Sequence, residues 1–193
     1  MERRVQFRNN WQIAGTILLL LVIVGVYLNA NERSQLLVKA GDVNLIQSGG
    51  ICYYKHVPLT GCVYERFPNG AWAKQIPYIN GRQDGLMRLW YPDNILQQER
   101  LFVNGNKQGI HKGWWPNGKL QFEYSFNKDE YNGPVKEWYA NGKLCRFFHY
   151  QMGHEEGLQQ MWWDNGTIRA NYVVKDGQQY GLIGRKLCRN LIK

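Results

Sequence analysis

The sequence predicts an all-β fold: an elongated, single-layer antiparallel sheet of 24-residue hairpin repeats, preceded by one N-terminal transmembrane helix. Glycines recur every 24 residues without a slip, at Gly61, Gly85, Gly109, Gly133, Gly157 and Gly181. Asparagines keep the same interval at positions 69, 117, 141 and 165, with Asp93 in the one remaining place. A fixed period of this length is the signature of a repeat architecture, in which each unit packs on its neighbours.

The composition restricts the class of protein. The chain has 193 residues, enough for one domain and an anchor. Its formal net charge is +9, but lysine and arginine are scattered, which favours a solvated basic surface over nucleic-acid binding. Aromatic residues make up 14% of the chain and glycine occurs 21 times, a mixture typical of strands separated by tight turns.

The N-terminal region is divided into a cytoplasmic segment (1–11), a transmembrane signal-anchor helix (12–30) and a linker (31–49). The run Ile13–Leu28 carries no charge, and its flanks extend it to the roughly 20 residues that a bilayer core requires. Three arginines among the first eight residues predict a cytoplasmic N-terminus and a periplasmic C-terminal domain on the inner membrane. A cleaved signal peptide is the alternative, although the run is long for one and Leu28 suits a cleavage site before Ala30 poorly.

The repeat domain is predicted to span residues 50–188 in about five to six units, with a basic tail at 189–193. Its first unit, ICYYKHVPLTGCVYERFPNG from Ile51, reads as two strands around a turn and caps the array. Cys52 and Cys62 are both even-numbered and lie on adjacent strands across the turn, so a cross-strand disulfide is geometrically possible in an exported protein. Cys145 and Cys188 are separated by about 17 Å of sheet, too far to bridge unless the tail folds back.

Each unit combines a pair of aromatic residues with a turn such as Pro116-Asn117-Gly118. This pattern predicts a type I turn followed by a left-handed residue, the three-residue hairpin loop. The loop places Trp138 opposite Leu144, and strict alternation of side chains then assigns the even-numbered residues to one apolar face. In one unit that face carries Trp114, Leu120, Phe122, Tyr124 and Phe126, and the odd-numbered face is mostly polar.

The aromatic pairs form two columns along the array. The first residues of the pairs are expected to build a structural core ladder, namely Trp90, Trp114, Trp138 and Trp162. The second residues are candidates for contact with a partner, because Trp and Tyr recur as interface anchors: Tyr91, Trp115, Tyr139 and Trp163. A purely structural role is the alternative for this second column.

Motifs for chemistry are missing from the sequence. The four histidines fall at unrelated repeat positions, and His154 is expected in a solvated loop. Neither metal-ligand spacing, a nucleophile motif nor a phosphate-binding loop is present. We therefore expect no enzyme activity, no metal, no cofactor and no small-molecule substrate.

The Y-x-N-G-x-L-x-x-E-x-x-Y-x-N-G-x-x-x-G pattern of the units resembles the MORN-repeat superfamily in its bacterial variant form. The closing stretch GLQQMWWDNGTIRANYVVKDGQQYGLIGRKLC is similar to the end of bacterial MORN-variant membrane proteins. The resemblance covers roughly residues 50–188. It implies a non-enzymatic scaffold of the kind implicated in membrane association, protein contacts and dimerisation. Some bacterial relatives are named as antitoxins, which fits an exported, anchored protein poorly.

The leading functional expectation is a single-pass, membrane-anchored scaffold or assembly subunit of a cell-envelope complex, which contacts partner proteins through its sheet. A module that binds cell-wall glycan or lipid is the alternative, and an antitoxin-type protein ranks below it. An enzyme would require convergent catalytic groups that a linear array of hairpins does not bring together in an obvious way.

Overall fold

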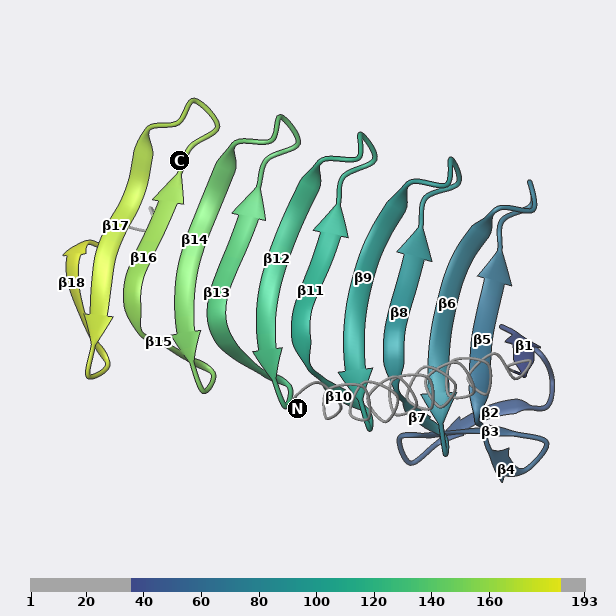
Figure 1. Cartoon of the computed structure of the whole chain (residues 1–193). Helices are drawn as coiled ribbons and strands as arrows, with labels where there is room; N and C mark the ends of the chain where they lie inside the picture. The colour runs from purple at the N-terminus through teal and green to yellow at the C-terminus, as the bar shows by residue number, and fades with distance from the viewer. Residues whose placement is uncertain (1–35, 185–193) are drawn as a thin grey trace, which may run out of the picture. The chain divides into compact units, whose positions relative to one another are not determined.

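The computed structural model describes residues 36–184, and every regular element in this range is a β-strand. The strands form a 15-stranded sheet and a separate 3-stranded sheet (Figure 1). The prediction of an all-β, mainly antiparallel fold is confirmed. No helix within residues 36–184 is long and apolar enough to cross a membrane. The predicted anchor helix at 12–30 lies outside the described residues.

Five long hairpins follow one another across the large sheet (Figure 1). Their strand pairs are β5 Gly61–Arg66 and β6 Trp72–Ile79, β8 Gly85–Trp90 and β9 Leu96–Val103, β11 Gly109–Trp114 and β12 Leu120–Asn127, β13 Glu130–Trp138 and β14 Leu144–Gln151, β16 Gly157–Trp162 and β17 Ile168–Lys175. The edge strand β18 (Gln178–Leu182) pairs with β17, and three two-residue strands border the wider turns: β7 Arg82–Gln83, β10 Asn106–Lys107 and β15 His154–Glu155.

The tight turns between the two strands of each hairpin have the predicted geometry. In the turn after β13, the amide of Tyr139 donates to the carbonyl of Lys143 at 2.9 Å, and the amide of Gly142 donates to the carbonyl of Tyr139 at 2.8 Å. Gly142 has a φ of +91°, a left-handed conformation that glycine adopts without a steric penalty. Asn94 takes this place in one turn with a φ of +64°, in line with the tolerance of asparagine for that region.

A β-bulge follows every tight turn and overturns the predicted assignment of side chains to faces. Gly113 pairs with Phe122, but the next residue, Trp114, pairs with Leu120, so Gln121 is an extra residue on β12. Because of this extra residue, the even-numbered residues of the second strand that follow the bulge lie on the opposite face from the even-numbered residues next to the turn. The expectation that Trp114 shares a face with Phe122 and Phe126 is therefore wrong. The same register shift occurs in all five hairpins.

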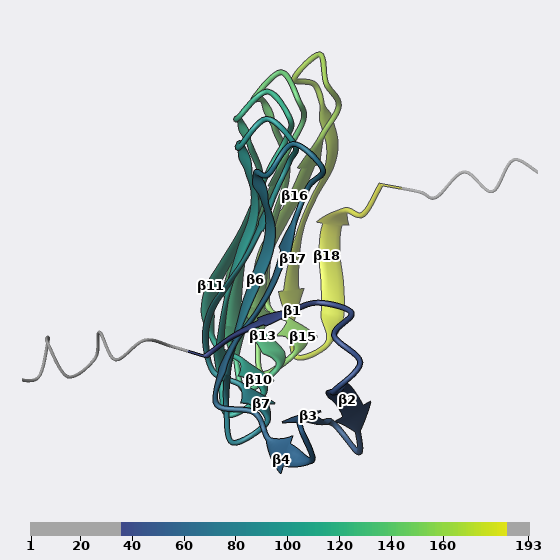
Figure 2. The same cartoon turned by 90° about the vertical axis from the view of Figure 1, so that its right-hand side faces the viewer.

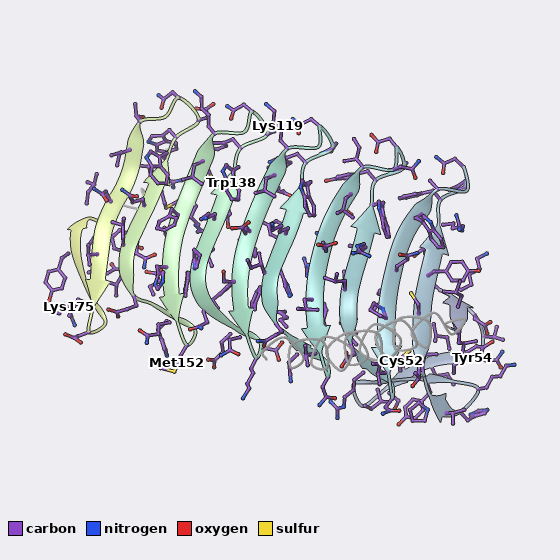
Figure 3. The ribbon with its side chains drawn as sticks, viewed as in Figure 1. Cys52, Tyr54, Lys119, Trp138, Met152 and Lys175 are labelled. Atoms are coloured by element: carbon purple, nitrogen blue, oxygen red, sulfur yellow. The ribbon has the colours of Figure 1, made fainter. Side chains whose placement is uncertain are left out.

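We name the two faces by what they carry. The inner face carries buried Val63, Val135 and Phe148, with residues that share their orientation, and the outer face carries the first residues of the aromatic pairs. The predicted core ladder of Trp90, Trp114, Trp138 and Trp162 is half-buried, and none of the four is among the buried core residues. Figure 3 shows side chains on the ribbon, with Trp138 near the tight-turn edge and Met152 and Lys175 at the opposite edge.

Backbone and side-chain hydrogen bonds join successive hairpins at both edges. At the tight-turn edge, Asn117 Nδ2 donates to the carbonyl of Ala140 in the next turn at 2.7 Å. At the wide-turn edge, the amide of Gly153 donates to the carbonyl of Tyr131 at 2.9 Å, and the amide of Met152 donates to Asn132 Oδ1 at 3.3 Å. Neighbouring hairpins are therefore held in a fixed register at their ends as well as along the strands.

The N-terminal end of the sheet is capped by a small core. The strand β1 (Leu37–Lys39) pairs with β5 in parallel, and the small sheet consists of β2 Leu45–Ser48, β3 Ile51–Tyr54 and β4 Val57–Pro58. Val38, Cys52, Leu59, Val63 and Tyr78 pack together, so the small sheet covers the inner face at this end, the side on which Figure 2 shows β2–β4. This arrangement agrees with the expected capping role of the first unit.

The cysteines do not form the predicted bridge. Cys52 and Cys62 are free and buried, on β3 of the small sheet and β5 of the large sheet. The sequence analysis assumed that these two strands pair with each other, but they belong to different sheets. Burial raises the pKa of both thiols, which keeps them protonated near neutral pH. Cys145 is also free, and Cys188 lies outside the described residues.

Candidate partner-binding groove

The inner face is hollowed over the third and fourth hairpins. An open depression of about 340 Å³ lies between them near the tight turns. Eight residues line it: Trp115, Gln121, Phe122, Tyr124, Glu137, Trp138, Tyr139 and Cys145. Trp138 belongs to the outer face, but its backbone carbonyl accepts a hydrogen bond from Trp115 Nε1 at this place. Gln121 and Cys145 are the bulge residues of their hairpins, so the register shift that follows each turn helps to shape the depression.

A polar network fixes the floor of this depression. Glu137 Oε1 accepts hydrogen bonds from the hydroxyl of Tyr124 at 2.8 Å and from an Nη of Arg146 at 3.0 Å. Burial raises the pKa of Tyr124, and the adjacent Glu137 carboxylate raises it further. The carboxylate is thus engaged by two partners, which suits a structural role better than general acid or base chemistry.

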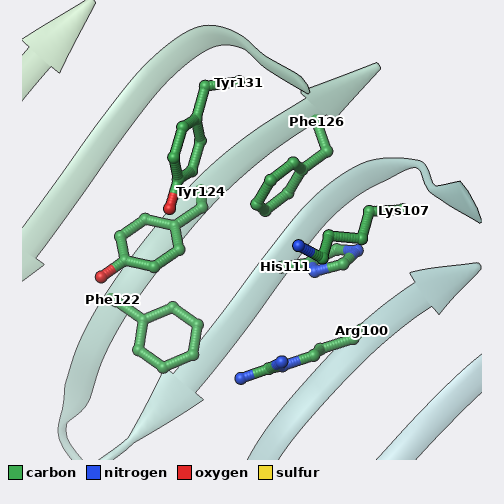
Figure 4. A pocket seen from close by; sticks show the side chains of 7 residues that line it. All are labelled: Arg100, Lys107, His111, Phe122, Tyr124, Phe126 and Tyr131. Atoms are coloured by element: carbon green, nitrogen blue, oxygen red, sulfur yellow. The ribbon is translucent and has the colours of Figure 1, made fainter. Parts of the chain in front are cut away.

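A second, smaller cavity of about 120 Å³ adjoins the first, and Phe122 and Tyr124 line both. The remaining lining residues are Arg100, Lys107, His111, Phe126 and Tyr131. Figure 4 shows the aromatic rings on one side of this cavity and the three nitrogen-bearing side chains on the other. We call the two cavities together the inner groove.

Stacked rings build the aromatic wall of the inner groove. The rings of Phe122 and Tyr124 stack with centroids 4.5 Å apart, and those of Phe126 and Tyr131 stack at 4.6 Å. Phe122 lies across Gly113 on the neighbouring strand, where a Cβ atom would stand only 2.1 Å from the ring. Glycine at this position is therefore required for the ring to lie where it does.

His111 is buried beneath the cavity, with only 2% of its surface exposed. Its Nε2 lies 2.8 Å from the carbonyl oxygen of Leu101, to which it donates, and its ring packs on Phe126 with centroids 4.6 Å apart. Desolvation lowers the pKa of His111, so the ring is neutral at pH 7. The sequence argument missed this residue, although valine at the matching positions 63 and 135 signals a buried place.

The predicted partner-binding residues take part in contacts between hairpins. The hydroxyl of Tyr91 donates to the carbonyl of Trp114 at 3.0 Å, Trp115 Nε1 donates to that of Trp138 at 3.0 Å, and the hydroxyl of Tyr139 donates to that of Trp162 at 2.9 Å. The structural alternative thus has direct support for these three.

Of the four candidates, Trp115 and Tyr139 lie together in the inner groove. Trp163 lies elsewhere and is 48% exposed, with the guanidinium of Arg169 at 4.5 Å from its ring centroid. A partner contact by any of them stays a prediction.

Other chemistry finds little support in the described part of the chain. Within residues 36–184, no group of three or more His, Cys, Asp or Glu side chains is arranged to hold a metal ion. His154 lies in β15 at the wide-turn edge and is exposed. Buried Gln159 is a further residue that the sequence argument missed, and its Nε2 donates to the carbonyl of His149 at 2.8 Å, a structural contact.

Comparison with known proteins gives one positive finding. Three segments match the MORN repeat variant. They span residues 83–104, 107–128 and 131–151, which cover the second, third and fourth hairpins and the inner groove. The matches support the MORN repeat family for this part of the chain. No curated protein sequence matches the chain.

Proposed function

We propose that this protein is a non-enzymatic, membrane-anchored scaffold or assembly subunit of a cell-envelope complex that binds a partner protein through the inner groove. MORN repeats generally serve as protein- or membrane-interaction modules, which supports a binding role. The observation that carries the proposal is the open 340 Å³ depression in which Trp115 and Tyr139 lie together. Aromatic residues of this kind recur as anchors at the centres of protein interfaces.

The size and openness of the groove favour a protein partner. Small-molecule sites are clefts of about 300–1,000 Å³ that bury most of the ligand surface. The larger cavity is at the bottom of this range and is open, and the smaller one is below it. Two shallow, adjoining cavities suit side chains of a protein segment that runs across the face.

Hydrogen bonds between hairpins prepare this surface for binding. Tyr139 and Trp115 reach across to the next hairpin, and Asn117 does the same from the turn. A surface that is held in place loses little conformational entropy when a partner docks. The rigid sheet therefore supports a scaffold role.

The cellular setting is part of the same proposal. The uncharged run within residues 12–30 and the arginines before it support a single-pass anchor in the inner membrane, with the repeat domain in the periplasm.

A photo-crosslinking amino acid tests the proposal in cells. Gln121 lines the larger cavity, and no hydrogen bond joins its side chain to another described residue. Ile110 serves as the matched control, because it is 52% exposed on the outer face of the same hairpin. We expect a covalent adduct with one reproducible protein from position 121 and none from position 110. Equal adducts at both positions, or none at either, contradict the proposal.

Binding of cell-wall glycan or lipid is a second candidate, favoured by the exposed ring of Trp163 with Arg169 beside it. A protein with Trp163→Ala should then lose pelleting with cell wall or liposomes while its melting temperature is unchanged. Trp115→Ala is unsuitable for this test because Trp115 Nε1 holds the next hairpin. Pelleting that survives Trp163→Ala removes this candidate.

A further inference from the structure

The smaller cavity of the inner groove is lined by two positively charged side chains that have no acidic partner in the described part of the chain. Arg100 and Lys107 line it, and neither forms an ion pair with another residue in 36–184. Elsewhere on the sheet the pattern is different. Arg88 pairs with Glu99 at 2.8 Å, and Arg146 pairs with Glu137 at 3.0 Å. The cavity is thus a place where positive charge faces space instead of a carboxylate.

The guanidinium of Arg100 is short of a partner. Its Nε is buried and makes no hydrogen bond within the described structure. A buried donor without an acceptor carries a free-energy cost, although Arg146 Nε is in the same state while its guanidinium pairs with Glu137. Arginine is also the side chain best suited to grip a carboxylate with two parallel hydrogen bonds.

Within residues 36–184, no acidic side chain lines the cavity. Asp129 lies at the wide-turn edge, where its Oδ1 accepts a hydrogen bond from the backbone amide of Lys107 at 2.8 Å, and it is not part of the lining. Lys107 Nζ lies 5.2 Å from the ring centroid of Phe126. The cavity therefore combines two positive groups with aromatic rings, and His111 adds no charge because it is neutral and its Nε2 is engaged.

We infer that the smaller cavity receives a single acidic side chain, aspartate or glutamate, from the protein segment that docks in the inner groove, while an apolar side chain of the same segment occupies the larger cavity. This inference rests on the proposed function and specifies the chemistry of the partner. The volume of about 120 Å³ suits one side chain, well below the roughly 300 Å³ at which small-molecule sites begin. The wall of Phe122 and Tyr124 between the cavities places the two side chains close together.

The surroundings favour a peptide over a lipid headgroup. Figure 2 shows β2–β4 and β18 standing out on one side of the large sheet, and β2–β4 pack on the inner face. A flat bilayer would meet these projections before it reached the cavity. An extended peptide passes between them.

Selection from a random peptide display library tests the inference with the full chain purified in detergent. We expect enriched peptides to share an Asp or Glu close to an aromatic or aliphatic residue. The double variant Arg100→Gln and Lys107→Gln should bind the best peptide about tenfold more weakly or worse, since charge-assisted hydrogen bonds are lost. It should also lose much of the salt dependence of that binding. Melting curves establish that the variant is folded.

The matched control is the double variant Lys112→Gln and Lys136→Gln, which removes the same charge. Both lysines pair with Glu123 on the outer face at 3.6 Å. Peptide affinity should be close to that of the parent protein. An equal loss in both double variants would mean that only net charge matters and would overturn the inference.

Two further outcomes separate this inference from the proposed function. If selection enriches peptides without an acidic residue, the groove binds a partner but the acidic side chain is wrong. If no peptide is enriched, the proposed function itself fails. Displacement of the peptide by short-chain phosphatidylglycerol, but not by short-chain phosphatidylcholine, would assign the cavity to a lipid headgroup and overturn the peptide proposal.

Discussion

Replacement of Gly113 by alanine probes the aromatic wall of the inner groove. The added Cβ would stand 2.1 Å from Phe122 Cε1 and 2.6 Å from Cδ1 and Cζ, whereas ordinary contact begins at 3.4 Å. The Phe122 ring must then move by more than about 1 Å. It stacks on Tyr124, with centroids 4.5 Å apart, and is buried, so it has little room to do so.

Two effects of opposite sign set the magnitude. Overpacking of this kind costs about 1–3 kcal/mol of folding free energy. Alanine is favoured over glycine within a strand by about 0.5–1 kcal/mol, chiefly through the unfolded state. The clash wins, and the net destabilisation should be about 1–2 kcal/mol, which lowers the melting temperature by about 2–8 °C for a chain of this length.

Thermal unfolding followed by tryptophan fluorescence measures this effect, and a double-mutant cycle with Phe122→Leu identifies its cause. The smaller side chain relieves the clash, so the double variant should be more stable than the sum of the single losses by about 1 kcal/mol. Ile110→Ala, on the exposed outer face of the same strand, should change stability by less than about 0.5 kcal/mol. If Gly113→Ala melts like the parent, or if the two substitutions are additive, the steric argument is refuted.

Two further changes address the hydrogen bonds of the sheet. Tyr139→Phe removes the 2.9 Å hydrogen bond to the carbonyl of Trp162 and should lower the free energy of unfolding by about 1 kcal/mol in a denaturant titration. An unchanged free energy of unfolding would show that this hydrogen bond does not stabilise the contact between the two hairpins. Burial, the charge of Glu155 and its hydrogen bond raise the pKa of Tyr172 from 10.0 to about 12. The unfolded state therefore loses this proton first, so this stabilisation is complete below pH ~10 and is lost as the pH rises towards ~12. Tyr172→Phe should flatten the alkaline decline in stability, and an unchanged decline would refute this assignment.

Much of the local architecture is readable from the sequence. The spacing of the glycines and turn asparagines locates the hairpins, because glycine and asparagine adopt the left-handed conformation of the tight turns most readily, and one of them occupies that place in all five hairpins. The strand after each turn, such as Leu120–Asn127, follows from its residues and the three-residue loop. The same features carried the resemblance to MORN repeats, which three segments now support.

The pairing of residues directly across each turn was also predictable, and Trp138 does lie opposite Leu144. The error entered one residue later. Assigning faces by odd and even residue numbers requires that residues pair one to one along both strands. Cys145 breaks this pairing, because it is a bulge residue between Leu144 and Arg146. One extra residue reverses the face of everything that follows, since side chains alternate with a period of two.

The sequence by itself therefore determined the hairpins and their order, since these depend on local turn and strand preferences. Tertiary structure alone decided which face is packed, that β1 joins β5 in parallel, and that Arg100 and Lys107 meet the rings of Phe122 and Tyr124 in one cavity. These outcomes depend on the register between strands and on the packing of separate hairpins. Both arise from contacts between residues distant in the chain, which the period of a repeat does not specify.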